Sequence, residues 1–442
     1  MAEKVSVLSP PQSHVSDWPH TSEVVASEGF KQQDSQGAWP KLDWCSRSMV
    51  LRMLERIEHG GLLVRDPIDE VRVGDWTDRN DTAELRVVDV GFYRRILAGG
   101  SLAAAEAFID GLWSCDDLTK TLSILGRNFR ILGALQRGPV RLIEPMRRLL
   151  HWLHRNTRSG ARRNIAAHYD LSNEFFALFL DDTMTYSSGI FEDENSTLRD
   201  ASIAKYERIC NKLRLTPQDH LLEIGTGWGG MAIHAAKNYG CRVTTTTISK
   251  QQFDLAAARI AQARLEDRIT LLAEDYRDLT GHYDKLVSIE MVEAVGHEYL
   301  PTYMRKCCDL LKPDGRMCLQ AITIPDHRYA RYRRSVDFIR RYIFPGGCLL
   351  SMSNIGRSLS RTDFRMSHWE DFSLDYAKTL ACWRANFHTR LDEIRALGYS
   401  ESFLRMWDYY LSYCEAGFRE RLTGVSQIVF SKPADRRSFL SL

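Results

Sequence analysis

The chain has 442 residues, a length that favours two or three structural units over a single core. Hydrophobic residues make up 44% and charged residues 26%, as in ordinary globular enzymes, and a formal net charge of +2 points to no partner. The ten cysteines form no CxxC pair and no zinc spacing, so we expect reduced thiols and no bound metal. Neither an apolar signal segment nor a run of ~18 apolar residues is present, which indicates a cytoplasmic protein.

The N-terminal third predicts a leader and a small accessory domain. Residues 1–45 are rich in Ser, Pro, Gln and charge without periodicity, so we expect a disordered leader. Apolar residues at helical spacing over 48–59 predict a helix, and GLLVRD and ELRVVDV predict two short strands. The stretch 91–128 predicts two or three helices punctuated by glycine. We assign 46–134 to an accessory α+β domain.

The segment 135–163 is basic and amphipathic. It carries eight arginines against one acid, Glu144, and its leucines share one helical face. One interpretation is a helix that lies on an anionic membrane, where each nearby cation contributes roughly 1 kcal/mol. The other is a solvated linker helix that packs on the next domain, and the sequence leaves both open.

From residue 220 onward, apolar strands alternate with helical stretches. The strands are HLLEI, CRVTTTTI, RITLLAED, DKLVSIEMV and GRMCLQAITI. This pattern predicts an α/β fold with a doubly wound parallel sheet, whose ligands lie at the carboxyl ends of the strands. VSQIVFSK predicts a last strand, and 164–200 with 326–425 predict a helical cap over the substrate. We assign 164–442 to this domain.

A glycine-rich turn, LLEIGTGWGG (221–230), follows the first of these strands. Gly225, Gly227 and Gly230 spell GxGxxG, which fits a dinucleotide site. However, Trp228 adds bulk, and TTTTIS offers no acid for a ribose at the end of the second strand. An acid two residues before the first glycine, here Glu223, is frequent in S-adenosylmethionine sites. Both cofactors remain open on these residues alone.

Six motifs in order resemble the cyclopropane fatty acid synthase family of S-adenosylmethionine-dependent methyltransferases. They are HYDLSNEFFALFLDDTMTYSSGIF (168–191), LLEIGTGWGGMAIHAA, TTTISKQQ, DYRDL, SIEMVEAVGHEYL and DFIRRYIFPGGCLLS. The resemblance covers about 46–430 and disfavours the dinucleotide site. It implies a peripheral membrane enzyme that delivers a methyl group from the cofactor to the cis double bond of a phospholipid acyl chain.

The resemblance also implies the cofactor contacts, matched position by position. They are Tyr169, Tyr186, Ser187, Glu223, Gly225, Gly227, Thr247, Gln252, Asp275 and Tyr276. Gly225 and Gly227 would approach the methionine part, and Thr247 and Gln252 would lie near the ribose. Structural roles compete with these assignments: Tyr169 could be a packing aromatic, and Gln252 a surface amide.

A bicarbonate ion, which accepts a proton from the substrate, is a further implication of the resemblance. The residues at its positions are Ser188, Glu293, Gln320, Tyr376 and the backbone amide of Ile322. We take the side chains of Glu293, Tyr376, Gln320 and Ser188 as catalytic. Glu290, three residues before Glu293, is the rival acid of that motif; one of the two is expected to anchor the fold.

Two of these positions depart from the family pattern. Ser188 stands where a cysteine is usual, and Gln320 where a histidine is usual. Glutamine donates a hydrogen bond but does not titrate near neutrality. Proton loss could therefore be slowed or redirected, so that a hydride shift gives a methylene branch, or a methyl branch after reduction. A cyclopropane product, a branched product and neutral substitution all stay open.

The partners are expected to be phospholipid. The stretch 326–347 carries six arginines with interleaved aromatics, but YIFPGG within it matches the family, so we expect headgroup contacts and no nucleic acid. The basic segment disfavours a small-amine methyltransferase. The intact glycine loop, with Glu293 and Tyr376, disfavours a non-catalytic membrane module. A homodimer is left open, and six aromatics are candidates to meet the substrate cation: Tyr186, Phe175, Phe176, Tyr342, Phe344 and Tyr376.

Overall fold

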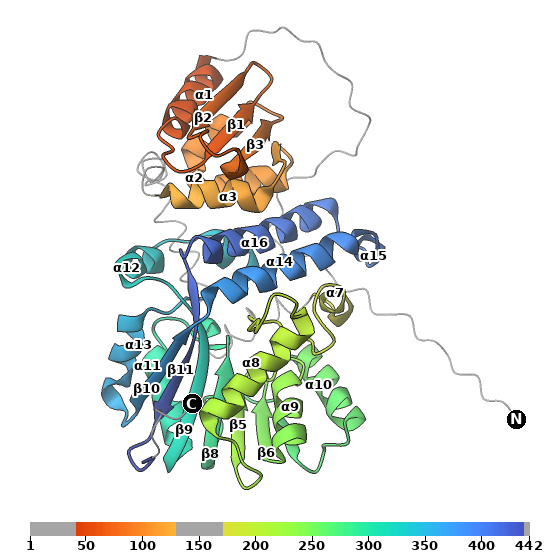
Figure 1. Cartoon of the computed structure of the whole chain (residues 1–442), viewed down its shortest axis with the longest axis vertical. Coiled ribbons are helices and arrows are strands. Elements are labelled where there is room, and N and C mark those ends of the chain that lie inside the picture. Colours follow the sequence, from red (N-terminus) through yellow and green to blue (C-terminus); the bar gives the residue numbers. More distant parts are fainter. Residues whose placement is uncertain (1–40, 130–170, 437–442) are drawn as a thin grey trace, which may run out of the picture. The chain divides into compact units, whose positions relative to one another are not determined.

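The computed structural model describes residues 41–129 and 171–436, which contain two β-sheets and their helices (Figure 1). Residues 1–40 and 130–170 lie outside the described residues. They include most of the expected leader, the whole basic segment 135–163 and Tyr169. Within the two described stretches, no helix is both long and apolar enough to cross a membrane.

The first sheet has four strands in the order β2-β1-β3-β4. They are β1 (Gly61–Arg65), β2 (Glu70–Gly74), β3 (Thr82–Val87) and β4 (Trp113–Cys115), with a 3-10 turn η1 (Arg79–Asp81). β1 and β3 are parallel, and the two outer pairs are antiparallel. Helices α1 (Lys41–Leu54), α2 (Gly91–Ile109) and α3 (Leu118–Arg127) accompany the sheet. The sequence predicted β1, β3 and the helices but not the short β2 and β4.

Helix α1 begins earlier than the sequence predicted. Its buried positions Ser46, Val50 and Leu54 recur every four residues, and Asp43 places an acid in the first turn, where the helix dipole favours it. The helix therefore starts at Lys41, inside the stretch expected to be a disordered leader. The leader prediction is wrong for residues 41–45.

The second sheet has seven strands in the order β10-β11-β9-β8-β5-β6-β7. They are β5 (His220–Ile224), β6 (Arg242–Thr246), β7 (Ile269–Leu272), β8 (Tyr283–Ile289), β9 (Leu311–Thr323), β10 (Arg365–Asp371) and β11 (Gly424–Ser431). The five strands β5 to β9 are parallel, as predicted. The sheet is nevertheless mixed, because β11 runs antiparallel to β9 and β10 runs antiparallel to β11.

Helices cover both faces of this sheet, which confirms the doubly wound α/β fold. Successive strand residues point to opposite faces. Leu221 and Val429 pack in one core with α8 (Leu198–Leu213), α9 (Gly230–Tyr239) and α10 (Lys250–Gln262). Their neighbours Leu222 and Ile428 pack in another with α11 (Leu300–Asp309) and α13 (Met352–Ser358), which the 3-10 turn η4 (Leu359–Arg361) follows.

Further helices gather beyond the carboxyl ends of the parallel strands. They are α7 (Asn173–Ala177), the 3-10 turn η2 (Val292–Ala294), α12 (Asp326–Arg334), the π-helical turn η3 (Ile339–Ile343), α14 (Ser373–Thr389), α15 (Leu391–Ala396) and α16 (Glu401–Arg419). The expected cap is only partly helical: 171–197 holds α7 alone, and β10 lies within 326–425. Long helices α14 and α16 lie side by side (Figure 1), and α16 also contacts α2 and α3.

Candidate active site

A cavity of about 560 Å³ opens at the carboxyl ends of the parallel strands. Twelve of the residues predicted from the sequence line it: Tyr186, Ser187, Glu223, Gly225, Gly227, Thr247, Gln252, Asp275, Tyr276, Glu293, Ile322 and Tyr376. Ser188 and Gln320 are fully buried but are not among the lining residues. The structure therefore brings nearly all of the predicted residues to one place.

The glycine loop presents its backbone to this cavity. Gly225, Gly227 and Gly229 have φ values of 101°, 52° and 88°, in the region that favours glycine. A Cβ on Gly225 would come within 3.0 Å of Met291, whereas one on Gly227 would meet no atom within 4 Å. At Gly225 the protein leaves no room for a side chain, because Met291 packs against the loop. At Gly227 the space beside the backbone is free, so a ligand can approach it closely.

Glu223 is the penultimate residue of β5, the strand before the loop. Thr245 donates a hydrogen bond of 2.6 Å to its carboxylate, and the Thr226 hydroxyl lies 2.6 Å from that of Thr245. Burial raises the pKa of Glu223 to about 8. A cationic group entering the cavity would favour the ionised form of this carboxyl, so the site suits a ligand with an amino group.

The expected ribose and adenine contacts follow the next two strands. The Thr247 hydroxyl donates to Oε1 of Gln252 at 2.9 Å, and both side chains are buried, so Gln252 is not a surface amide. The Asp275 carboxylate accepts hydrogen bonds from Nε and Nη2 of Arg277 at 2.8 and 2.7 Å. Arg277 was not predicted, although it belongs to the same DYRDL motif.

Glu290 is the centre of a second cluster of hydrogen bonds in the cavity. Its Oε1 accepts hydrogen bonds from the Ser188 backbone amide at 3.0 Å and from Nε2 of Gln320 at 2.8 Å. Its Oε2 accepts one from the Tyr376 hydroxyl at 2.7 Å. Three of the five residues expected to bind an anion therefore bind this carboxylate, which was not among the predicted site residues.

Ser188 contributes differently from the expectation. The sequence suggested that its hydroxyl replaces a thiol as a donor to an anion. Instead, the hydroxyl donates to the Gly189 carbonyl at 3.0 Å, and only the backbone amide of Ser188 faces Glu290. Residue 188 therefore contributes to this cluster through its backbone amide, and its hydroxyl points away from Glu290 toward the Gly189 carbonyl.

Gln320 belongs to a directed chain of hydrogen bonds. Nζ of Lys212 donates to Oε1 of Gln427 at 2.6 Å, and Nε2 of Gln427 donates to Oε1 of Gln320 at 3.0 Å. Because an ammonium group can only donate, Lys212 fixes the orientation of both amides. The NH₂ group of Gln320 therefore faces Glu290.

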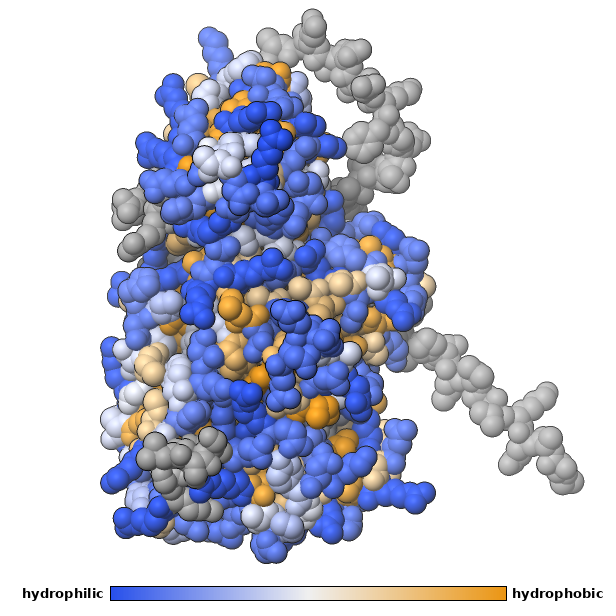
Figure 2. Space-filling view, in the orientation of Figure 1, coloured by the Kyte–Doolittle hydropathy of each residue, from blue (hydrophilic) through white to orange (hydrophobic). Residues whose placement is uncertain are grey.

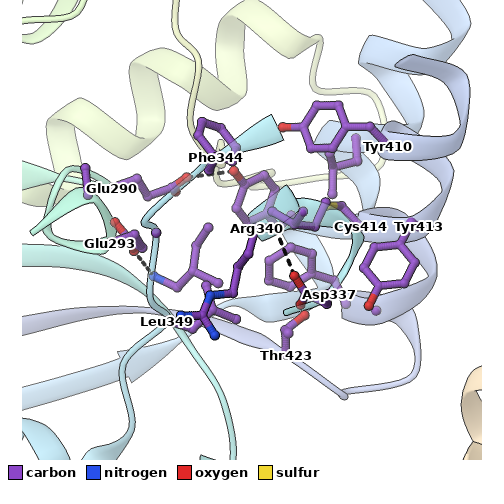
Figure 3. A pocket seen from close by; sticks show the side chains of 18 of the residues that line it. Glu290, Glu293, Asp337, Arg340, Phe344, Leu349, Tyr410, Tyr413, Cys414 and Thr423 are labelled. Atoms are coloured by element: carbon purple, nitrogen blue, oxygen red, sulfur yellow. Dashed lines mark hydrogen bonds between the residues drawn. The ribbon is translucent and has the colours of Figure 1, made fainter. Parts of the chain in front are cut away.

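Glu293 has a poorer environment than Glu290. Its Oε1 accepts a hydrogen bond from the Ile322 amide at 2.5 Å, an amide that the resemblance assigned to the bicarbonate ion, while its buried Oε2 has no partner among the described residues. Burial and then the nearby charge of Glu290 raise the pKa of Glu293 to about 8. Figure 3 shows both glutamates reaching the pocket from the same side.

A buried lysine that feels the charge of Glu290 was also missed. Nζ of Lys205, on helix α8, donates to Oγ of Ser187 at 2.6 Å. Burial lowers the pKa of Lys205 to about 8, and the charges of Glu290, Asp181 and Glu223 oppose that shift. A lysine on the buried face of an amphipathic helix was the only sequence signal for it.

Five of the six candidate aromatics divide into two groups; the sixth, Tyr342, is not among the lining residues, and its hydroxyl donates to Glu106 at 2.7 Å. Tyr186, Phe344 and Tyr376 line the cavity. Phe175 and Phe176 are fully buried and pack against Phe179 and Trp407, so they belong to the core. Among the described residues, no group of His, Cys, Asp and Glu side chains is placed to hold a metal ion.

Comparison with known proteins agrees with this geometry. Residues 156–428 match the family model described as mycolic acid cyclopropane synthetase. The chain is 39% identical over 353 residues to tuberculostearic acid methyltransferase UfaA1 of Mycobacterium tuberculosis, which covers 76% of this chain and 79% of that protein. It is 38% identical over 354 residues to cyclopropane-fatty-acyl-phospholipid synthase of Escherichia coli, with coverage of 79% and 88%.

Solved structures give the same result. The mycolic acid cyclopropane synthase CmaA1, complexed with SAH and CTAB, superposes with a TM-score of 0.58 at 33% identity. The similarity covers 61% of this chain and 98% of that one. Family model, relatives and fold all support the resemblance seen in the motifs. The chain belongs to the mycolic acid cyclopropane synthetase family.

Proposed function

We propose that this protein is an S-adenosylmethionine-dependent methyltransferase that adds a methyl or methylene group to the cis double bond of phospholipid acyl chains. The observation that carries the proposal is a single cavity that contains both the glycine loop and a pair of buried glutamates. One end suits a cofactor with an amino group, and the other suits removal of a proton from a hydrocarbon.

The cofactor end fits the expected ligand. Gly227 leaves open space for close approach, Glu223 supplies a carboxyl, and Thr247 with Gln252 supplies hydroxyl and amide groups. S-adenosylmethionine, when bound, supplies an electrophilic methyl group on sulfur. The residues of this chain orient the cofactor and keep water from it.

The remaining lining of the cavity is suited to an acyl chain. Apolar residues of the first sheet and its helices contribute to it: Val64, Leu85, Ile96, Trp113, Leu122 and Leu125. Such a lining gains free energy by burying methylene groups, at roughly 0.8 kcal/mol each. The Escherichia coli relative is named for a fatty-acyl-phospholipid, which is the same class of substrate.

Aromatic side chains support the charge that develops on the substrate. Methyl transfer to an alkene leaves a carbocation, which aromatic faces stabilise in a dry site. Tyr186 and Tyr410 line the cavity, and their hydroxyls lie 2.8 Å apart. That contact fixes both rings, and Phe344 adds a third.

Peripheral association with a phospholipid membrane forms part of the proposal. Its support is the basic segment seen in the sequence, together with Leu42 and Met49 of α1, which are exposed by 61% and 55%. Figure 2 shows hydrophobic residues scattered over a mostly hydrophilic face rather than one broad apolar patch. Surface charge is therefore expected to contribute to membrane binding, and a homodimer remains an expectation.

The alternative product is a methylene- or methyl-branched chain without ring closure. Its support is Gln320, an amide that cannot relay a proton and stands beside Glu290. The relative UfaA1 is named a tuberculostearic acid methyltransferase and matches this chain as well as the cyclopropane synthase does. Both products need the same methyl transfer.

The test is transfer of a labelled methyl group. The purified protein is incubated with deuteromethyl S-adenosylmethionine and vesicles of unsaturated phosphatidylglycerol, and the acyl chains are analysed by mass spectrometry. Label in the acyl chains, absent with saturated lipid, is the expected result. Label only in a soluble small molecule would support an amine methyltransferase and refute the proposal.

A further inference from the structure

We propose that the Glu290 carboxylate fills the anion site of this enzyme and accepts the substrate proton, in place of an external bicarbonate ion. The inference rests on the proposed function and deepens it. Glu290 lines the cavity and receives hydrogen bonds from Ser188, Gln320 and Tyr376. Those three residues were expected to hold the ion, and their donors are already engaged.

The backbone of Glu290 is held in an unusual conformation. Its φ is 48°, in the left-handed region that glutamate rarely adopts. The residue comes directly after β8, and its amide donates to the Gln320 carbonyl at 2.9 Å. Strained backbone of this kind persists where surrounding contacts fix it, commonly at functional sites. Here the strain aims the carboxylate into the cavity (Figure 3).

The surrounding donors identify Glu290 as the charged member of the glutamate pair. Gln320 presents its NH₂ group because Lys212, through Gln427, fixes the amide orientation. Tyr376 donates as well, so both carboxylate oxygens of Glu290 act as acceptors. Among the residues that the structure describes, Glu293 accepts one hydrogen bond, from the Ile322 amide, and its Oε2 has no partner. Burial raises the pKa of Glu290 as well, but hydrogen bonds from Tyr376, Gln320 and Ser188 and the charge of Lys205 oppose that shift. Because Glu290 has the larger set of donors, its anion is the better stabilised of the two carboxylates.

The ionised carboxylate completes the reaction without another anion. After methyl transfer, one alkene carbon carries the new methyl group and the other is a cation. Glu290 takes a proton from that methyl, and the C–H electron pair forms the third ring bond. If a hydride first shifts from the methylated carbon to the cation, the same proton loss forms a methylene double bond instead. In both cases Glu290 becomes a neutral carboxylic acid, and the proton count balances.

Two substitutions of Glu290 distinguish the effect of its negative charge from the effect of the space that its side chain fills. Glu290→Gln keeps the shape but removes the base, and we expect kcat to fall by at least about 100-fold. Glu290→Gly suits the left-handed backbone and opens the anion site. We expect the same loss, with activity restored by added bicarbonate or formate. Glu266→Gln, at an exposed position before β7, is the matched control.

Activity is measured with and without carbon dioxide removed from the buffer. We expect the unmodified enzyme to work equally well in both. A requirement for bicarbonate, full activity of Glu290→Gln, or no rescue of a Glu290→Gly protein that still binds adenosylhomocysteine would each overturn the proposal. Binding of adenosylhomocysteine, measured by calorimetry, shows that the variants are folded.

A second readout is independent of turnover. Carbon-13 NMR of labelled bicarbonate is expected to show binding to Glu290→Gly and none to the unmodified protein. If this pattern appears but no label reaches lipid, the proposed function fails while the occupied anion site stands. If label reaches lipid but the unmodified protein binds bicarbonate, the proposed function stands and the role of Glu290 is refuted.

Discussion

The two ends of the cavity are built in different ways. The expected cofactor end comes from consecutive strand–turn–helix units: the glycine loop joins β5, which contains Glu223, to α9, while Thr247 follows β6 and Gln252 lies in the first turn of α10. The other end, where we propose that the substrate proton is accepted, brings together Ser188, Gln320 and Tyr376 around Glu290, from positions 102, 30 and 86 residues away along the chain. The first is a local structure, and the second exists only in the folded protein.

The difference teaches where a family pattern can be transferred. A glycine loop needs particular backbone angles, so its glycines mark the turn in the sequence, although they do not choose between cofactors. An anion site needs only converging donors, and the anion can come from solvent or from the chain itself. Ser188, Gln320 and Tyr376 occupy the family's anion-binding positions, although two of them differ in residue type, and here they donate to the Glu290 carboxylate of the chain itself.

The largest effect should come from breaking the local end. Gly225→Ala places a side chain at a φ of 101° and within 3.0 Å of Met291. We expect the Kd of adenosylhomocysteine to rise about 100-fold, since the strain of roughly 1–3 kcal/mol falls on the loop that binds it. Gly398→Ala is the control: residue 398 has a similar φ of 93°, so the substitution introduces backbone strain, but it lies outside the cavity and has open space around it. Equal affinities in calorimetry would contradict this account of the loop.

The next effect tests the assembled end. Tyr376→Phe removes one donor to Glu290, and a hydrogen bond to a charged group contributes about 1.5–3 kcal/mol. We expect kcat to fall roughly 10- to 100-fold with unchanged affinity for adenosylhomocysteine. Tyr239→Phe, whose hydroxyl donates to Glu207 elsewhere, is the control. An unaltered kcat would mean that this hydroxyl does not support the base.

The glutamate pair predicts a pH dependence of stability. The folded protein raises the pKa of Glu293 from 4.5 to about 8, so it binds the proton more tightly than the unfolded chain. This contribution is complete below pH 4.5 and is lost as pH rises toward 8. Relative to Glu293→Gln, we expect the free energy of unfolding to fall by about 1.4 kcal/mol per pH unit in that window. If urea unfolding shows a constant difference in stability between the protein and Glu293→Gln across this pH range, the raised pKa of Glu293 is refuted.

The smallest effect on rate concerns the product. Gln320→His introduces a group that titrates near neutrality beside Glu290. We expect kcat to change by less than about 10-fold, while the product mixture shifts toward the three-membered ring. Gln218→His, on an exposed turn, is the control. An unchanged mixture in mass spectrometry would count against any role of a proton relay at this position.

Much of the fold could be predicted because its signals are periodic. The five parallel strands β5 to β9 are apolar runs between helical stretches, and each was found. The strands that escaped are β2, β4 and β10. β4 has only three residues. β10 (RMSHWED) is half-polar and lies at the sheet edge, where a strand need not be apolar, so its sequence shows no apolar run. Such strands are defined by their neighbours more than by their own residues.

The sequence by itself determined the α/β architecture, the glycine loop and the identity of most residues in the cavity, because backbone angles and apolar periodicity are properties of neighbouring residues. Only the tertiary structure decided that the Ser188 hydroxyl turns away, that Gln320 presents its NH₂ group, and that Glu290 receives the donors. The reason is that hydrogen bonds between distant segments depend on how strands and helices pack. The motif places glutamates at 290 and 293, and tertiary packing determines which of them accepts hydrogen bonds from Ser188, Gln320 and Tyr376.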